Sequence, residues 1–170
     1  MKKILLLLSL VLSVVFTNAQ TAWVTKKLDG KISVKFPEEP TKTTKTASES
    51  YVFKGKDSIQ YSATVLDYKI LANLDSATLA PLKDSQQFAD QMMAGMASQK
   101  PNYTFGEAKI GKWKTYTNYT FSGVDNTTKK QLSVQMILIG SKMYALTCLV
   151  PDKIVTKNDG LFLNSAELLK

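Results

Sequence analysis

The 170-residue chain contains no histidine and no arginine, and all 22 of its basic residues are lysines. Without histidine, the commonest general base and the commonest metal ligand are both missing. Without arginine, no planar fork is present to hold a carboxylate or phosphate at two points. The familiar phosphate-loop, dinucleotide, zinc and calcium-loop motifs are absent as well. We therefore expect no enzyme activity, no cofactor and no metal.

Cysteine is almost absent too: Cys148 is the only one, so no internal disulfide can form. It lies in the apolar run 144–150, which is typical of a central strand, and we expect a buried, monomeric, unreactive thiol. The net charge is +8, but the lysines are scattered among acids in runs no longer than two. Such scatter is typical of a solvated surface, and we expect no nucleic-acid partner.

Long apolar runs are missing except near the N-terminus. Residues 4–16 form an apolar stretch behind two lysines, too short to span the ~30 Å hydrocarbon core of a bilayer. Small residues precede a cleavage site between Ala19 and Gln20, so 1–19 is predicted to be a secretory signal peptide. We expect export to the periplasm or the medium, no membrane span in the mature chain, and one domain over 20–170.

The first strong period-two pattern covers residues 31–36. Ile32, Val34 and Phe36 alternate with polar residues, which predicts a strand with these three side chains on one buried face and Lys31, Ser33 and Lys35 in water. Proline ends this strand because it has no amide hydrogen for the ladder. We expect 37–40 to be a solvent-exposed corner with no bound ligand, followed by a solvated, β-prone threonine and lysine tract.

The period changes near Asp75 and Ser76, either of which is a natural helix N-cap. One helix is predicted from there to Pro101, distorted by Pro81 in its first turn. Its apolar face contains Leu79, Leu82, Ala89, Met92, Met93 and Met96. The three methionines have two interpretations: ordinary core residues, or flexible thioethers lining an apolar groove or pocket.

The second half of the chain is rich in strand patterns. We expect one strand over 103–110, a turn at Gly111, and a second strand on which Trp113 shares a face with Tyr119 and Phe121. Gly140-Ser141 predicts a two-residue type II′ hairpin between two strands that are apolar enough to be central. A C-terminal helix is predicted to open at Pro151-Asp152.

Taken in order, these elements resemble the PsbP-like fold group. The resemblance is carried by Trp23 before a turn, the segment GKISVKFPEEP at 30–40, the mid-chain helix, the strand meander and FLNS at 162–165. It implies an α+β sandwich, an antiparallel β-sheet meander flanked by helices. It also implies binding or assembly roles more than catalysis. The tryptophan that plant members carry soon after the strand-ending proline is absent here.

Two functions stay open at this point. One is an exported, non-enzymatic accessory or protein-interaction module, monomeric and with an unnamed partner. The other is a carrier of a small apolar ligand, held between the helix with Met92, Met93 and Met96 and the sheet. An enclosed apolar cavity of several hundred cubic ångströms would favour the carrier, and an exposed methionine patch over a filled core would favour the partner surface. Separately, Ser58 and Ser76 lie in Asp-Ser-aliphatic or Asp-Ser-small tripeptides that resemble acceptors of bacterial O-glycosylation.

Overall fold

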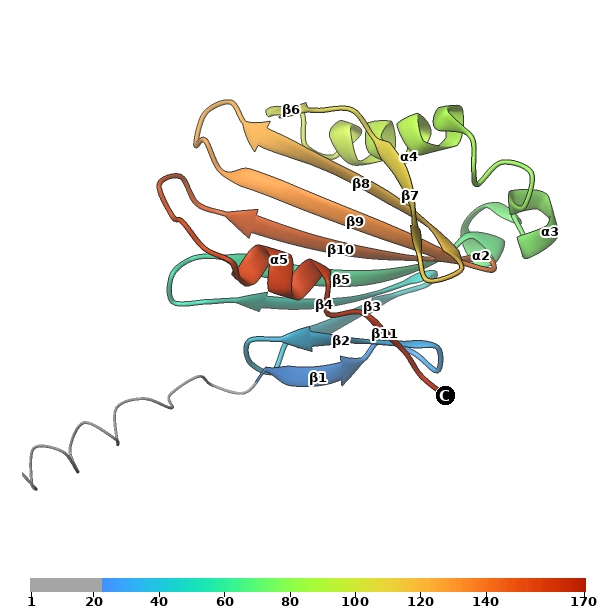
Figure 1. The fold of residues 1–170 in the computed structure, drawn as a ribbon, viewed down its shortest axis with the longest axis horizontal. Helices are drawn as coiled ribbons and strands as arrows, with labels where there is room; N and C mark the ends of the chain where they lie inside the picture. The colour runs from blue at the N-terminus through green and yellow to red at the C-terminus, as the bar shows by residue number, and fades with distance from the viewer. Residues whose placement is uncertain (1–22) are drawn as a thin grey trace, which may run out of the picture.

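A computed structural model describes residues 23–170 (Figure 1). Its body is an eight-stranded sheet with the order β3-β4-β5-β10-β9-β8-β6, in which β7 also pairs with β8; a small sheet has the order β1-β2-β11. The strands are β1 (Val24–Lys27), β2 (Ile32–Phe36), β3 (Thr41–Lys45), β4 (Ser48–Lys54), β5 (Gln60–Asp67), β6 (Tyr103–Phe105), β7 (Lys109–Trp113), β8 (Tyr116–Asp125), β9 (Gln131–Ile139), β10 (Lys142–Val150) and β11 (Glu167–Leu168). The helices are α2 (Tyr68–Ala72), α3 (Ser76–Leu79), α4 (Gln86–Ser98) and α5 (Asn158–Leu163). The α+β class and the antiparallel meander flanked by helices are confirmed.

The centre of the large sheet is the β9–β10 hairpin, as the apolar pattern predicts. β10 lies between β5 and β9, and Ile139 pairs with Lys142 across the turn. The φ angle is positive at Gly140 (65°) and negative at Ser141. A type II′ turn requires this combination.

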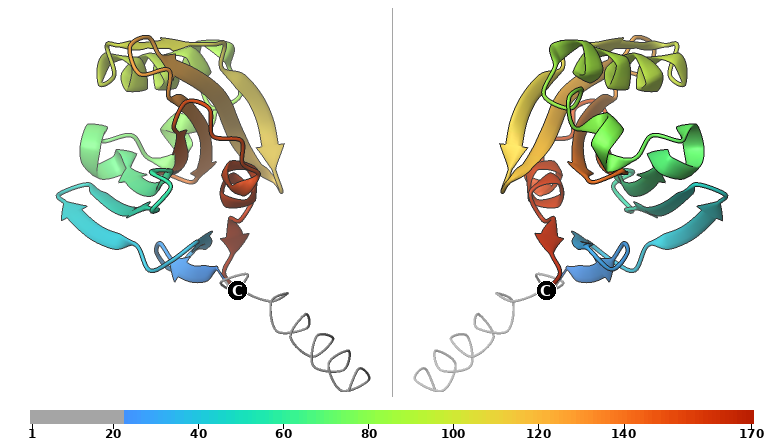
Figure 2. Two further views of the ribbon diagram at one scale, coloured as in Figure 1. Left: turned by 90° about the vertical axis from the view of Figure 1, so that its left-hand side faces the viewer. Right: turned by 90° about the vertical axis from the view of Figure 1, so that its right-hand side faces the viewer.

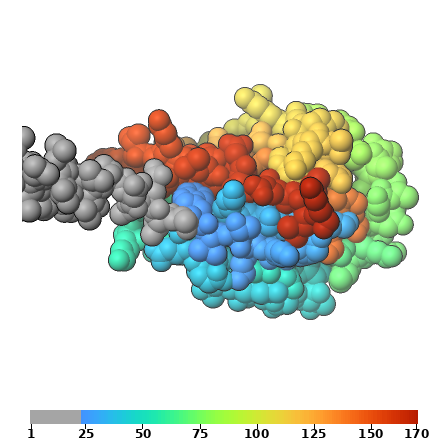
Figure 3. All heavy atoms as spheres, turned by 60° about the horizontal axis from the view of Figure 1, so that its bottom comes forward, coloured from blue at the N-terminus to red at the C-terminus, as the bar shows by residue number. Residues whose placement is uncertain are grey.

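One face of the large sheet is covered by the small sheet and α5, and the other face by α4 (Figures 1 and 2). Under the small sheet, Ile32, Val34 and Phe36 are fully buried, which confirms the predicted face of β2. The Phe36 ring meets the Phe162 ring of α5 edge-on, with centroids 5.1 Å apart. These contacts place β2 and the C-terminal segment side by side over one face of the large sheet (Figure 3).

Two details around β2 differ from the prediction. Ser33 is buried, although the alternation places it in water, because β2 lies between β1 and β11 and Glu167 sits opposite Ser33. In the corner after β2, Glu38 and Glu39 are exposed as expected, but Pro40 is buried. Glu39 forms an ion pair with Lys26 of β1, so the corner is held against the small sheet.

The single mid-chain helix of the prediction is wrong: two helices occur, α3 and α4. The Asp75 carboxylate caps α3 by accepting from the Thr78 N–H at 2.9 Å, and the Ser85 hydroxyl caps α4 by accepting from the Phe88 N–H at 3.3 Å. Pro81 lies in the turn between them, where its missing amide hydrogen breaks no hydrogen bond inside a helix. Leu82, which the single-helix pattern placed on the apolar face, is 43% exposed.

Three further boundaries differ. Residues 103–110 are divided between β6 and β7, and Gly111 lies inside β7 instead of at a turn. The turn falls after β7, where Lys114 has φ of 54°, so Trp113 packs near Tyr116 in the small-sheet core and not beside Phe121. The C-terminal helix begins at Asn158 instead of Pro151.

Candidate functional site

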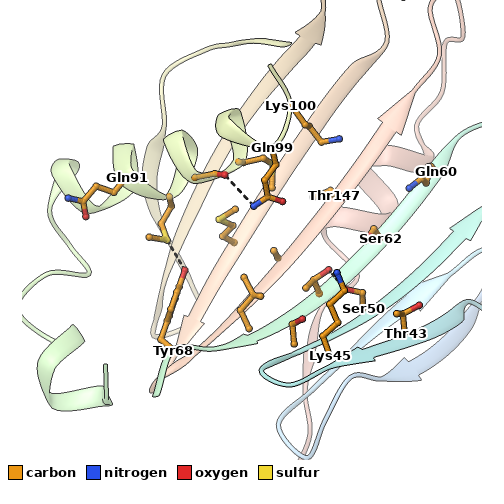
Figure 4. Close-up of a pocket in the computed structure, with 18 residues that line it drawn as sticks. Thr43, Lys45, Ser50, Gln60, Ser62, Tyr68, Gln91, Gln99, Lys100 and Thr147 are labelled. Atoms are coloured by element: carbon orange, nitrogen blue, oxygen red, sulfur yellow. Dashed lines mark hydrogen bonds between the residues drawn. The ribbon is translucent and has the colours of Figure 1, made fainter. Parts of the chain in front are cut away.

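An open groove of about 510 Å³ lies between α4 and the outer strands β3, β4 and β5 (Figure 4). Helix α4 covers the β8–β9 half of its sheet face, where the space beneath it is filled by Phe88, Ala89 and the side chains of those strands. The neighbouring half, over β5 and β4, has no helix above it. The edge of α4 therefore forms a wall, and the uncovered strands form a floor; we call this the methionine groove.

The wall consists of the half-buried Met92 and Met96 of α4, with exposed residues of the same helix beside them. Met92 and Met96 are one helical turn apart, so they lie on the same face of the helix and line the groove. Gly95 lies beside them and leaves open space, since a Cβ built there finds no heavy atom within 4 Å. All three methionines pack on the apolar cluster under α4, but Met93 does not line the groove. Met92 and Met96 thus both pack on the core and line the groove, whereas Met93 packs on the core alone.

The floor is polar, and sequence reasoning missed it as a site. Along β5, Tyr61, Ala63 and Val65 face the small sheet, while Gln60, Ser62, Thr64 and Leu66 face the groove. The Ser50 and Thr64 hydroxyls of neighbouring strands are 2.9 Å apart and hydrogen-bonded. The sequence does show that these β5 residues alternate with the buried ones. Hydroxyl side chains in such an alternation are typical of an ordinary solvent-exposed face, however, so the sequence gave no reason to predict a site there.

One corner of the groove is closed by Tyr68, at the start of α2. Its hydroxyl donates to the Met92 sulfur at 2.9 Å, which joins α2 to α4 across the end of the groove (Figure 4). Burial raises the pKa of Tyr68 to about 12, so the phenol stays neutral and is no base at physiological pH.

The charged residues that line the groove are both lysines. Lys45 comes from β3, and Lys100 from just beyond α4, where its Nζ lies 5.2 Å from the centroid of the Tyr103 ring. No aspartate or glutamate lines the groove. The lining therefore combines thioether and aromatic surface, neutral hydrogen-bonding groups and positive charge.

Outside the groove, the thiol of Cys148 is part of the apolar core. Cys148 is fully buried, as expected, in the core between the large sheet and the small sheet. Burial, with smaller contributions from the charges of Asp159 and Asp57, raises the pKa of the Cys148 thiol to about 12. At neutral pH the reactive thiolate is therefore scarce. Over residues 23–170, no group of three histidine, cysteine or carboxylate side chains lies close enough to hold a metal ion.

A second polar cluster joins the β1–β2 turn to the centre of the large sheet. Asp29 accepts from the Tyr144 hydroxyl at 2.7 Å, from the Lys142 Nζ at 3.1 Å and from the backbone N–H of Lys31 at 2.8 Å. Burial raises the pKa of Asp29, but the hydrogen bonds from Lys31, Tyr144 and Lys142 together outweigh it and hold the pKa below its usual value. Each group has a partner, so the cluster is a structural link.

The remaining predicted positions are placed as follows. Ser58 lies in an exposed turn with φ of 64°, and Ser76 begins α3 and is also exposed. The aspartates of both tripeptides have local structural roles, since Asp57 accepts from the Ile59 N–H and Asp75 caps α3. Ala19 and Gln20 lie outside the described residues, so the cleavage site stays a prediction. None of the helices within 23–170 has the length and apolar character needed to cross a membrane.

The architecture defines an α+β sandwich class, and comparison with known proteins narrows it. Neither the protein-family models nor the curated proteins include a match. Among solved structures, the chain is similar to the solution structure of cyanobacterial PsbP (CyanoP) from Synechocystis sp. PCC 6803, with 12% identity, a TM-score of 0.60, and coverage of 91% of this chain and 96% of that chain. The fold of this chain is therefore PsbP-like, which confirms the resemblance seen in the sequence.

A crystal structure from Bacteroides thetaiotaomicron VPI-5482 is more distant. It has 8% identity and a TM-score of 0.46, and the match covers 89% of this chain but 49% of that chain.

Proposed function

We propose that this protein is an exported, non-enzymatic binding module and that the methionine groove is its binding site. The observation that carries the proposal is the half-covered face of the large sheet, where Met92 and Met96 stay partly accessible beside a filled core. Flexible thioethers adapt to different apolar shapes, which suits a binding surface. The volume of about 510 Å³ lies within the range that is common for small-molecule sites.

The absence of catalysis is part of the proposal. It is supported by a chain without histidine or arginine and by the raised pKa values of Tyr68 and Cys148, which keep both groups protonated at neutral pH.

Export is supported by the N-terminal apolar stretch and its cleavage pattern. Cell fractionation with N-terminal analysis tests it: a mature chain beginning at Gln20 is expected, and retention of the first lysines would contradict it.

A second candidate function is an accessory protein that binds a protein partner. The observation that favours it is β3, which ends the strand order of the large sheet and has five exposed residues. A free edge can receive an extended segment from a partner, and the PsbP-like fold group is one in which assembly roles are expected. Lysines at such an edge also protect against unwanted pairing, so this function ranks second.

A photo-crosslinking residue at position 95 tests the groove as a binding site in living cells. Gly95 lines the groove and has room for a side chain, whereas the neighbouring Ala94 is exposed and does not line it, so the same residue at 94 is the matched control. We expect an adduct from position 95 and none from position 94. A mass increase of a few hundred daltons would indicate a small ligand, and a much larger one a protein partner. Equal adducts from both positions, or none from either, would contradict a binding groove.

A further inference from the structure

We propose that the ligand of the methionine groove is an anionic amphiphile: a single acyl chain of medium length that ends in a carboxylate. The chain lies in the corner formed by Tyr68, Met92 and Leu66, and the carboxylate lies toward the lysines of the rim. The inference rests on the proposed function, because it assigns a ligand class to the same groove. It follows from how apolar, polar and charged groups are distributed over the lining.

The apolar part of the lining is gathered at one corner. The Tyr68 hydroxyl is joined to the Met92 sulfur at this corner (Figure 4). Leu66, from the end of β5 next to Tyr68, also lines this part, and Ala145 of β10 and Met136 of β9 continue the apolar floor beside Thr64. Burying methylene groups against such apolar surface is favourable, so the corner favours a hydrocarbon chain.

Most of the polar lining lies away from this corner, although Ser48 pairs with Leu66 across β4 and β5. Gln60, Ser62 and Thr147 lie across the groove from Tyr68 (Figure 4). Covering these hydrogen-bonding groups with hydrocarbon would leave them without partners, which costs free energy. A wholly apolar ligand therefore fits poorly, and the groove is not the enclosed apolar cavity expected of an apolar carrier. A ligand with one apolar end and one polar end matches the lining.

The sign of the polar end follows from the two lysines. Lys45 and Lys100 form no ion pair, as is true of most lysines in residues 23–170; what they share is a place on the lining of the groove. On β3, Lys42 pairs with Glu49 at 2.9 Å, while Lys45 stands between the groove and a neighbouring pocket that contains Glu49 and Asp67. A carboxylate on the ligand would provide the missing charge.

Calorimetric titration of the full mature protein with dodecanoate and with dodecyltrimethylammonium, both below their micelle concentrations, tests the inference. The two probes have unbranched hydrocarbon chains of similar length and differ in the charge of the head. We expect dodecanoate to bind at least tenfold more tightly than the cationic probe. The double variant Lys45→Gln and Lys100→Gln should lose that preference, whereas the matched control Lys54→Gln and Lys56→Gln, at exposed positions outside the groove, should keep it.

The outcomes separate the two proposals. Equal binding of both probes, or a preference that survives the Lys45 and Lys100 changes, would overturn the anionic head and leave the groove as a binding site. Failure of the unmodified protein to bind dodecanoate would overturn the ligand class; the crosslinking result at position 95 then decides whether the groove binds another class. Circular dichroism of each variant, with an unchanged melting temperature expected, excludes loss of folding as the cause.

Discussion

The two faces of the large sheet follow different rules, although the same strands form both. The face under the small sheet is apolar from β5 through β10 to β9, and it is sealed by Ile32, Val34, Phe36 and Phe162. The face under α4 is apolar over β8, β9 and part of β10; over β5 and β4 it carries hydroxyls and amides and stays open. The sheet face is uncovered where its side chains are polar. On β5, the residues that face away from the small sheet are mostly polar, and they form the floor of the groove.

The largest expected effect lies on the sealed face. Phe36→Ala should lower the free energy of unfolding by about 3–5 kcal/mol, because it removes a fully buried ring in contact with Phe162 and leaves a cavity. Urea unfolding monitored by tryptophan fluorescence measures it. A loss under about 1 kcal/mol would show that the small sheet is not part of the cooperative core.

Next comes the polar link at the edge of that face. Tyr144→Phe should cost about 1.5–3 kcal/mol at neutral pH, because it removes a hydrogen bond to the partly buried Asp29 carboxylate. Tyr116→Phe, a half-buried phenol of β8, is the matched control, with an expected change within about 0.5 kcal/mol.

The pH dependence sharpens the same test. The pKa of Asp29 is lowered in the folded state, so its contribution is present above the unfolded pKa and is lost as the pH falls through the lower, folded value. Tyr144→Phe removes one cause of that lowering, so the variant should lose less stability on acidification. The unfolding free energies of the two proteins should therefore converge toward pH 2. A constant difference at all pH values would contradict this linkage.

The sequence predicted the sealed face far better than the open one. The alternation at 32, 34 and 36, the hairpin turn at Gly140 and the burial of Cys148 are local patterns with one physical solution each, and all were confirmed. The groove depends on where α4 lies over the sheet. The helix starts at the Ser85 cap, after the turn that contains Pro81, and the apolar pattern of 79–96 gave no sign of this interruption. Spacing alone suggested Met92, Met93 and Met96 together and could not separate Met93, which does not line the groove; Lys45 and Lys100 join the lining only through the tertiary fold.

Adjacent residues of β5 provide the most direct comparison of the two faces. Ala63 is fully buried under the small sheet, and Ser62 is half-buried on the groove floor. Ala63→Ser should cost about 1–3 kcal/mol, because it places a hydroxyl in an apolar core. Ser62→Ala should change stability by no more than about 0.5 kcal/mol. Chemical denaturation of the two variants side by side checks the pair, and equal effects would mean that the groove floor is as closed as the core.

The smallest expected effect is a gain, at Gly95 on the wall of the groove. Glycine inside a helix costs about 0.5–1 kcal/mol relative to alanine, mainly through backbone entropy. A Cβ at this position finds no heavy atom within 4 Å, so the gain should be realised in full and the groove should keep nearly all its space. Gly95→Ala should therefore raise the free energy of unfolding by about 0.5–1 kcal/mol and leave dodecanoate binding within twofold. Ala94→Gly, one position along the exposed side of α4, should lower stability by a similar amount. If Gly95→Ala instead weakened binding tenfold, the ligand would have to contact the backbone of α4 at Gly95. The side chains of Met92 and Met96 would then not be the main contact surface of the wall.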